Sequence, residues 1–424
     1  MEQYGTILLF AIPFFLVLIV TEKIYGYYNG INHAPIIDSV ASISSGITNS
    51  LKDVLGLSIV ILSYSWMVSN LALFHQEATV LTYGIAFIII DFYGYWTHRW
   101  AHQINLFWNK HAIHHSSEEF NLSCALRQPI SNFLNLFSFL LLPAALLGVP
   151  KEIITIILPI HLFLQFWYHT RYINKLGFVE YILVTPSHHR VHHAINPEYI
   201  DKNHSQIFII WDKLFGTFQA ELETVPPVYG ITRPAQTWNP IKINFQHLWL
   251  MMTDAYRADN WKDKLTIWFQ PTGWRPPGFE EKYPIPKIEN VYDFEKYGTA
   301  NSNTLIYWSM TQMFATLLIV SYLFGSIAKI GTPAIFIYGA FIFISIYSYS
   351  ELMDKNKQSL TWEVIRCLFG LGIIFYYGDW FGLNTIIPFG TYLIIAYLIL
   401  SVVMNSYLIR NNFGTKKQLN TSNH

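Results

Sequence analysis

The sequence predicts an all-α protein in which a multi-span bundle of transmembrane helices carries a cytoplasmic, histidine-rich cap that holds two metal ions. Three observations lead to this prediction. Of the 424 residues, 52% are hydrophobic and only 13% are charged, whereas soluble chains carry about a quarter charged residues. Several apolar stretches approach the length of about 20 residues that a bilayer-spanning helix needs. Twelve of the sixteen histidines fall in one segment, between His98 and His204.

Nine stretches of the sequence are candidate membrane spans. They cover residues 5–25, 53–74, 79–97, 132–149, 151–169, 304–324, 331–349, 361–379 and 384–409. The fourth and fifth are joined at Gly148-Val149-Pro150, a tight turn that predicts a helical hairpin. The stretch from 170 to 303 is too polar to span, so we expect it to cap one membrane face. The chain then divides into N-terminal transmembrane helices at 1–78, a histidine-rich unit with the hairpin and the cap at 79–300, and C-terminal transmembrane helices at 301–424.

The distribution of basic residues orients this arrangement. A hairpin that returns the chain puts the ends of the third and fifth spans on one side, together with the polar stretch. Most Lys and Arg residues then fall on that side, and the opposite loops carry only Lys151 and Lys329. The positive-inside rule therefore makes the histidine-rich face cytoplasmic. The formal net charge is zero with His neutral, so nothing points to a nucleic-acid partner.

The histidines form three clusters with helical spacing, in WTHRWAHQ, NKHAIHHSSEE and PSHHRVHHAINPEY. Residues at i, i+3 and i+4 share one helix face, so each cluster can direct its imidazoles at one point. One more histidine stands at the end of the fifth apolar stretch. Together they give nine candidate metal ligands: His98, His102, His111, His114, His115, His169, His189, His192 and His193.

The number of candidate ligands indicates two metals. A single tetrahedral zinc needs only four ligands, and imidazole also suits iron, copper and nickel. Nine nitrogens leave each of two metals room for an exogenous ligand, which is typical of a catalytic site. His188 points to a different helix face from its neighbour, whereas His161 and His204 stay open between a packing role and a site role. Isolated histidines are predicted to be structural or at the surface: His33, His75, His247 and His424.

The residues around the clusters narrow the chemistry. A zinc protease needs H-E-x-x-H with its glutamate as base, whereas the first pair here reads HRWAH. The E-x-x-H pairs of carboxylate-bridged di-iron bundles and nucleotide-binding glycine motifs are also missing, so electrons must come from elsewhere. An all-histidine site at a membrane face suits oxygen activation. The alternative is a histidine-rich membrane protein that transports or binds metal, which would need ligands along a path through the membrane.

At these residues the chain resembles a known family. The pattern H-x3-H, H-x2-HH, H-x2-HH in a multi-span protein is similar to that of the fatty acid hydroxylase/sterol desaturase superfamily of membrane di-iron oxygenases. Within it, the alkylglycerol monooxygenase branch shows the greatest resemblance. The segments that carry it lie between Asp91 and Lys242: DFYGYWTHRWAH, HHSSEEFNLSCALRQ, QFWYHT, TPSHHRVHHAINPEYIDKNHSQIFIIWDKLFGTFQAE and YGITRPAQTWNPIK.

The resemblance implies an activity and a set of partners. It implies that 79–300 is a catalytic domain and that the nine histidines hold two Fe ions. It also implies that the protein uses O2 and an external electron donor to hydroxylate or desaturate a lipid taken from the bilayer, at one of its C–H bonds. In the alkylglycerol branch the donor is tetrahydrobiopterin, and the ether-linked carbon of an alkylglycerol lipid is hydroxylated. The chain departs from that branch at Gln103, where the branch has a glutamate, and at His204 and Ser205, where the family usually has an aromatic residue and a glycine.

Two carboxylates near the clusters are candidates to support catalysis. Ligating histidines usually donate their second N–H to a carboxylate or a carbonyl. Asp91 lies about two turns before His98 in an apolar stretch, where a charge is costly and usually functional. Glu118 follows the second cluster. The alternative for each is a capping or loop residue.

Overall fold

The computed structural model describes residues 2–60, 62–132, 134–135, 137–299 and 301–413. Within them the secondary structure is helical apart from one parallel pair of two-residue strands, which confirms the all-α prediction. The α-helices are α1 (Glu2–Tyr28), α2 (Ile36–Val54), α3 (Tyr64–Leu71), α4 (Val80–Gln103), α5 (Asn105–His115), α6 (Leu142–Leu146), α7 (Lys151–Phe163), α8 (Pro186–His192), α9 (Ile210–Leu214), α10 (Pro240–Arg257), α11 (Trp261–Thr266), α12 (Phe279–Lys282), α13 (Asn303–Ile330), α14 (Ala334–Met353), α15 (Ser359–Tyr377) and α16 (Gly390–Asn412). The strands and 3-10 helices are β1 (Ile59–Val60), β2 (Leu134–Asn135), η1 (Leu122–Leu126), η2 (Ser138–Leu141), η3 (Gly177–Tyr181), η4 (Val291–Asp293) and η5 (Leu383–Thr385).

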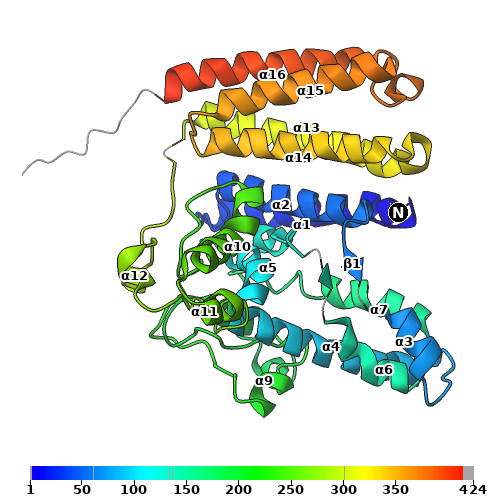
Figure 1. Ribbon diagram of the computed structural model, residues 1–424, viewed down its shortest axis with the longest axis vertical. Coiled ribbons are helices and arrows are strands. Elements are labelled where there is room, and N and C mark those ends of the chain that lie inside the picture. The colour runs from blue at the N-terminus through cyan, green and yellow to red at the C-terminus, as the bar shows by residue number, and fades with distance from the viewer. Residues whose placement is uncertain (1, 61, 133, 136, 300, 414–424) are drawn as a thin grey trace, which may run out of the picture.

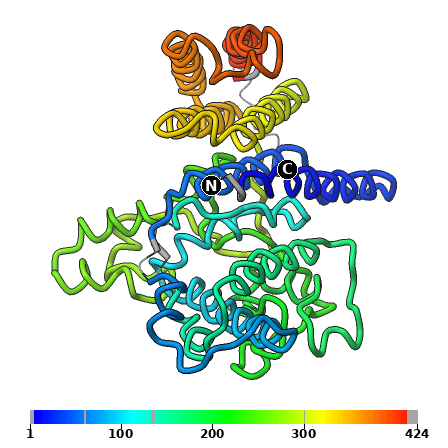
Figure 2. Tube along the Cα trace, turned by 90° about the vertical axis from the view of Figure 1, so that its right-hand side faces the viewer, coloured from blue at the N-terminus to red at the C-terminus, as the bar shows by residue number. Residues whose placement is uncertain are grey.

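The helices are stacked in layers along the longest axis of the molecule (Figure 1). α15 and α16 lie at one end, α13 and α14 pack beneath them, and α1 and α2 pack against α13. The other end holds α3 to α11 with their connecting loops. The side view shows α1 and α2 between this unit and the C-terminal helices (Figure 2). The N-terminal helices therefore join the C-terminal bundle to the unit that carries the histidine clusters.

Six helices of the described residues are long and apolar enough to cross a membrane. They are α1 from Gly5 onward, α4, α13, α14, α15 and α16. Large apolar side chains on their outer faces, such as Phe10, Leu318 and Phe375, are exposed, as expected of side chains that contact lipid. The chain is thus an integral membrane protein, although three of the nine predicted spans are wrong.

The predicted span at 53–74 is wrong because the chain turns inside it. α2 ends at Val54 and Gly56 follows with a φ of +66°, a conformation that favours glycine. Only β1 and the eight residues of α3 come after it. The helix in this region is α2, whose buried face includes Ser42, Ser44 and Thr48. Its hydroxyl and charged side chains lower its hydropathy, and the search for apolar stretches therefore missed it.

The hairpin predicted at 132–169 is present in a shorter form, and neither of its halves is a span. Gly148 makes the turn with a φ of +75°, where a Cβ would lie 1.8 Å from the carbonyl oxygen of Phe74. α6 has five residues and α7 has thirteen. At 1.5 Å per residue α7 is about 20 Å long, less than the ~30 Å hydrocarbon core of a bilayer. Both helices pack along α4, so the hairpin returns the chain toward the histidine clusters without crossing twice.

Two apolar cores hold the site between them. The larger core lies among α1, α2 and the C-terminal helices and includes Leu51, Val320 and Phe341. The smaller core joins α3, α4, α6 and α7 through residues such as Ala86 and Ile153. Burial of large apolar side chains contributes about 1.5–3 kcal/mol each, so these cores fix the helices from which the histidines project.

Candidate metal centre

Local sequence places the histidines on short helices that meet at one end of α4. His98 and His102 are one turn apart on α4, and the chain then turns at Ile104, which has extended backbone. Asn105 holds this corner, because its side-chain amide donates to the carbonyls of Ile267 (3.0 Å) and Trp274 (3.1 Å). α5 therefore folds back against α4 and brings the second cluster beside the first.

The third cluster lies on α8. Thr185 is extended and Pro186 occupies the first helical position, where proline is favoured because its missing N–H is not needed. The seven-residue helix ends at His192, and His193 is its C-cap. His169 comes from the turn after α7. The returning hairpin and this short helix thus complete the set of nine.

The nine histidines form two compact groups, within each of which the candidate ligand atoms lie within 4.8 Å of one another. In the first group His98 Nε2 is 2.8 Å from His111 Nε2, and His115 Nε2 is 3.0 Å from that same atom. His115 Nε2 is also 3.1 Å from His192 Nε2 and 3.2 Å from His102 Nε2. The first group consists of His98, His102, His111, His115 and His192.

The Nε2 atoms of the second group are similarly close to one another. His189 Nε2 is 2.9 Å from His169 Nε2 and 3.0 Å from His193 Nε2. His114 Nε2 is 3.4 Å from His169 Nε2. His114 and His115 of α5 belong to different groups, and so do His189 and His192 of α8, so the two groups share two helices. The prediction that each cluster directs its imidazoles at one point is therefore wrong for the second and third clusters. The second group consists of His114, His169, His189 and His193.

Backbone carbonyls fix the orientation of several rings. The carbonyl of His204 lies 2.7 Å from His98 Nδ1, and that of Arg127 lies 3.2 Å from His114 Nδ1. The carbonyls of Gln165 and Lys202 hold His169 Nδ1 at 2.9 Å and His192 Nδ1 at 3.0 Å. A carbonyl oxygen can only accept, so in each neutral ring Nδ1 carries the hydrogen and Nε2 presents its lone pair. This is the arrangement that metal-ligating histidines use.

The surroundings of most of these rings keep them neutral. Burial lowers the pKa of His111, His115, His189 and His193 well below the usual value, and neighbouring imidazoles lower it further. Burial also lowers the pKa of His114 to about 4. The lone pairs therefore face one another at short distances without protons between them. A cation at the centre of each group removes this repulsion.

The spacing of the nitrogens fits a metal. Ligands about 2.1 Å from a metal are about 3.0 Å apart when they subtend a right angle, and about 3.4 Å apart in a tetrahedron. The Nε2 separations of 2.8–3.4 Å in the two groups cover this range. Imidazole nitrogen suits iron, zinc, copper and nickel. The clusters thus fit a metal-dependent oxygenase.

Asp91 is fully buried in α4 but faces away from the two groups. Its carboxylate accepts from His161 Nε2 (2.8 Å), from Trp211 Nε1 (2.8 Å) and from the backbone amides of Ile207 (3.0 Å) and Phe208 (3.1 Å). It therefore anchors the segment after residue 203 to α4. That segment supplies the His204 carbonyl, so Asp91 is connected to the first group only through the backbone.

Glu118 also lies beside the histidines and does not contact them. Its Oε2 accepts from the backbone amide of Tyr297, and burial raises its pKa. His188 packs its ring near Phe218. His161 belongs to the Asp91 network, and His204 contributes its carbonyl while its ring packs 5.0 Å from that of His102.

Gln103, where the chain departs from the alkylglycerol branch, and the isolated histidines lie outside the two histidine groups. Gln103 and His75 are exposed, and His33 contributes its carbonyl to Asn121 Nδ2 (2.9 Å). His247 lines a separate cavity of about 120 Å³. His424 falls outside the described residues.

Sequence reasoning missed the groups that position the rings. The carbonyls of Arg127, Lys202 and His204 have no signature, because every residue has a carbonyl. Asp212 shapes the last of these loops, since its carboxylate accepts from the amides of His204 and Ser205, both at 2.8 Å. Its place in IIWDKLFGTF, soon after the third cluster, was the available signal.

Comparison with known proteins agrees with this geometry. The model of the fatty acid hydroxylase family matches residues 83–217, which include all nine histidines. Alkylglycerol monooxygenase of Homo sapiens is 35% identical over 364 residues, which cover 84% of this chain and 80% of that protein. The protein of the same name from Danio rerio is 32% identical over 84% of this chain and 80% of its own length. Ornithine lipid hydroxylase of Rhizobium tropici is 29% identical over 148 residues, 35% of this chain and 45% of that protein.

No solved structure matches the chain. The family model and the long alignments both include the segment with the two histidine groups, and the resemblance seen in the sequence is therefore confirmed. The chain belongs to the fatty acid hydroxylase family, in the group that includes the alkylglycerol monooxygenases.

Proposed function

We propose that the protein is a membrane lipid monooxygenase in which the two histidine groups each hold one iron ion. The observation that carries the proposal is the arrangement of nine imidazoles in two groups, in each of which the ligand nitrogens lie within 4.8 Å of one another and the contacting Nε2 pairs are 2.8–3.4 Å apart. Bound there, the two irons would supply the activation of O2 that C–H hydroxylation needs. The nine imidazoles would give each iron a set of nitrogen ligands and leave room for an exogenous one.

The protein's own groups prepare this centre in two ways. Backbone carbonyls hold the Nδ1 hydrogens, so that Nε2 is free to bind a metal. The rings of Phe120, Trp108 and Tyr168 lie beside the groups, with centroids 4.3–5.3 Å from those of the nearest histidines. These apolar walls exclude water, which would otherwise compete for the open positions and intercept reactive oxygen species.

The substrate that we propose is a bilayer lipid with an ether-linked alkyl chain. The relatives that cover most of the chain are named as alkylglycerol monooxygenases, and a more distant one as a lipid hydroxylase. The spans beside the site give such a lipid access from the bilayer. Hydroxylation of the carbon next to the ether oxygen would yield an unstable hemiacetal and cleave the ether. Desaturation would use the same removal of hydrogen.

The proposal includes an orientation and an external reductant. The orientation that we propose puts this face in the cytoplasm, and the basic residues near the clusters support it by the positive-inside rule. The external electron donor follows from the lack of a nucleotide-binding motif, and tetrahydrobiopterin is the donor that the resemblance implies. A metal transporter is not favoured, because the nine histidines are gathered at one end of α4 and do not form a path along the spans.

Labelled oxygen tests the activity. The purified, iron-loaded protein is reconstituted in lipid nanodiscs with a 1-O-alkylglycerol, reduced, and supplied with ¹⁸O2. We expect one labelled oxygen atom in the fatty aldehyde product, provided that its exchange with water is blocked by immediate reduction to the alcohol. A protein that carries iron but consumes no O2 with any ether, glycerolipid or aminolipid substrate would contradict the proposal.

A further inference from the structure

A cavity of about 120 Å³ lies among α5, α10 and the segments that precede α10 and follow α11. Trp108 of α5 forms part of its wall. The same ring lies beside the first histidine group, with its centroid 5.2 Å from that of His102 and 5.7 Å from that of His115. None of the nine histidines lines the cavity, so it is close to the metal centre but separate from it.

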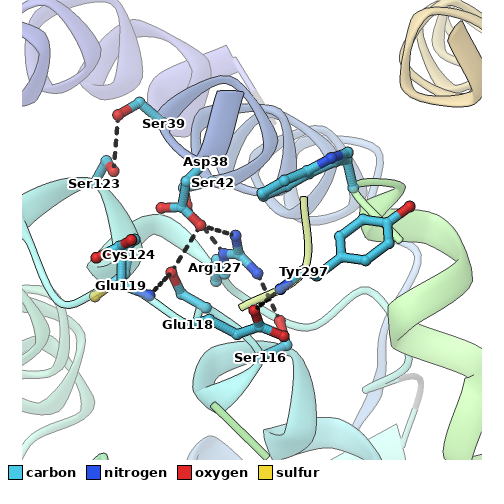
Figure 3. Close-up of polar contacts among 12 residues, drawn as sticks. Asp38, Ser39, Ser42, Ser116, Glu118, Glu119, Ser123, Cys124, Arg127 and Tyr297 are labelled. Atoms are coloured by element: carbon cyan, nitrogen blue, oxygen red, sulfur yellow. Dashed lines mark hydrogen bonds and ion pairs between the residues drawn. The ribbon is translucent and has the colours of Figure 1, made fainter. Parts of the chain in front are cut away.

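Arg233 brings a charge to this cavity that no neighbouring carboxylate pairs with. The buried arginines of the described residues each form an ion pair, and Figure 3 shows the pair in which Arg127 Nη2 is 2.6 Å from Asp38 Oδ1. The other pairs are Arg190 with Glu221, Arg275 with Asp254 and Arg366 with Glu363. Arg233 differs from them, because its Nε and Nη1 atoms are buried and have no hydrogen-bond partner among the described residues.

The carboxylate in the cavity wall is already in use. Asp254 attracts Arg233, but its two oxygens accept from Arg275 Nε (2.6 Å) and Nη2 (3.0 Å). Lys287 also lines the cavity and pairs with Glu280 at 2.8 Å. Burial and the nearby Arg275 lower the pKa of Arg233, yet a guanidinium stays protonated in proteins. The walls therefore favour an anion as the partner of Arg233.

Two more side chains of the wall have unused polar atoms. Thr272 Oγ1 and His247 Nε2 are buried, and neither has a hydrogen-bond partner among the described residues. With the two nitrogens of Arg233 they make four of the fourteen such atoms in the described part of the chain. Most buried polar groups in proteins are paired, so the concentration of unpaired ones around a single cavity indicates a polar ligand.

His247 adds an acceptor to these donors. Burial lowers the pKa of His247 to about 4, so its ring is neutral near pH 7. A hydrogen bond with the backbone of Asn105 uses the single N–H of the neutral ring, and Nε2 then presents a lone pair. The cavity thus offers N–H and O–H donors from Arg233 and Thr272, together with one acceptor from His247.

Two residues of the cavity wall also line a larger, open depression of about 610 Å³. They are Arg233 and Gln246. The depression is lined as well by Lys242 and by Trp249, whose side chain is 69% exposed. A ligand would therefore approach Arg233 through this depression. The exposed indole suits the apolar part of a lipid whose headgroup enters the cavity.

We propose that this cavity binds a phosphate monoester, carried by a small soluble molecule or by a lipid headgroup. The inference goes beyond the proposed function and does not depend on it. Arginine binds phosphate oxygens through charge-assisted N–H groups, and the Thr272 hydroxyl would donate to another oxygen. A monoester, whose second pKa is about 6, also has an O–H in its singly protonated form, which His247 Nε2 can accept.

The same set of groups disfavours other occupants. A cavity of this size holds several water molecules and hence also a phosphate group, but water would leave Arg233 without a counter-charge. Sulfate and phosphate diesters have no O–H near pH 7, so their oxygens would face the lone pair of His247 Nε2. A carboxylate has only two oxygens to share among the donors of Arg233 and Thr272.

Thermal unfolding without turnover tests the site. The iron-loaded full chain, in phosphatidylcholine nanodiscs and phosphate-free buffer near pH 6.5, is titrated with glycerol 3-phosphate. We expect a saturable rise in Tm for the parent and an affinity weaker by about tenfold or more in Arg233→Met. Without the ester Arg233→Met should be at least as stable as the parent, because it removes a buried cation that lacks a counter-charge. Lys262→Met, at an exposed position of α11, is the charge-matched control and should bind as the parent does.

A second arm uses nanodiscs that contain phosphatidate and no soluble ester. A rise in Tm that requires Arg233 in this arm alone assigns the site to a lipid headgroup, and one with glycerol 3-phosphate assigns it to a soluble ester. If Arg233→Met does not fold, Thr272→Val, which keeps the shape of its side chain, should still weaken binding severalfold. Equal stabilisation by sulfate would overturn the assignment to a monoester. The site itself is refuted if neither ester stabilises the parent, or if both variants bind as the parent does.

Discussion

Substitution of Asp91 by alanine tests how α4 organises the site. Four donors converge on this carboxylate, from His161, Trp211 and the amides of Ile207 and Phe208, at 2.8–3.1 Å. Each hydrogen bond to a charged acceptor contributes about 1.5–3 kcal/mol. These values do not add fully, because water and small movements recover part of the loss. We therefore expect Asp91→Ala to lower the free energy of unfolding by about 3–5 kcal/mol, the cost of removing one partner from a buried charged network.

The loss should also affect the two histidine groups unequally. The segment that Asp91 anchors leads from the carbonyls of Lys202 and His204, which hold His192 and His98 of the first group. The carbonyls that hold His114 and His169 come from other segments. Iron should therefore be lost from the first group before the second, and the iron content should fall toward one per chain.

The assay is thermal unfolding in detergent, followed by tryptophan fluorescence, together with iron analysis. The expected fall in Tm is roughly 3–6 °C for a chain of this size. Asp259→Ala, which removes an exposed carboxylate, should change stability by less than about 0.5 kcal/mol. If Asp91→Ala melts like the parent and keeps its full iron content, the carboxylate does not anchor the segment and the reasoning is refuted.

Three further predictions follow from the site and the topology. Alanine at His98, His111, His114, His189 or His192 should abolish lipid oxidation and lower iron content without affecting membrane insertion. His33→Ala should be near neutral in the same oxidation assay. Equal damage from His33→Ala would show that the division of the histidines into metal ligands and structural residues is wrong. Burial lowers the pKa of His114 to about 4, whereas the pKa of histidine in an unfolded chain is about 6.5. Between these values the unfolded state binds more protons, so the stability of the metal-free protein should fall with decreasing pH by about 1.4 kcal/mol per pH unit for this residue. A melting temperature that stays constant from pH 6.5 to 4.5 would contradict this. In a background without Cys124 and Cys367, cysteines placed at the exposed positions Gln103 and Lys175 should be labelled from the cytoplasm and those at Glu77 and Thr385 from the opposite side; labelling of Gln103 and Lys175 from opposite faces would exclude a shared metal centre.

The three histidine clusters could be predicted because their spacing is a local property. His98 and His102, or His189, His192 and His193, share a helix face whatever the rest of the chain does. Their assignment to two groups could not be predicted in the same way. It depends on the corner at Ile104 and on the separation of His114 from His115, whose rings leave α5 in different directions and join different groups.

The membrane spans were predicted only where hydropathy alone decides. α1, α4 and α13 to α16 each contain a long apolar window, and the predicted spans there are confirmed. α2 buries serines and the charged pair of Asp38 with Arg127 inside the protein, so its burial depends on partners distant in sequence. The apolar residues of 132–169 pack along α4 and do not form two spans. Hydropathy cannot distinguish apolar residues that pack against a neighbouring helix from those that face lipid.

The roles of Asp91 and Glu118 show the same limit. Both carboxylates were selected for their distance from a cluster along the chain. The structure turns Asp91 toward Trp211 and His161, and turns Glu118 toward Tyr297. The groups that decide these orientations lie seventy or more residues away along the chain, so spacing within the sequence motifs carries no information about them.

The iron content of the protein purified without oxygen tests the central claim most directly. Metal is measured by plasma mass spectrometry and protein by amino-acid analysis on the same sample. Two groups of five and four imidazoles predict two irons per chain, and they predict that His102→Ala and His193→Ala, one from each group, each retain about one. One zinc per chain, with lipid oxidation that does not depend on iron, would contradict a two-iron centre and the function proposed from it.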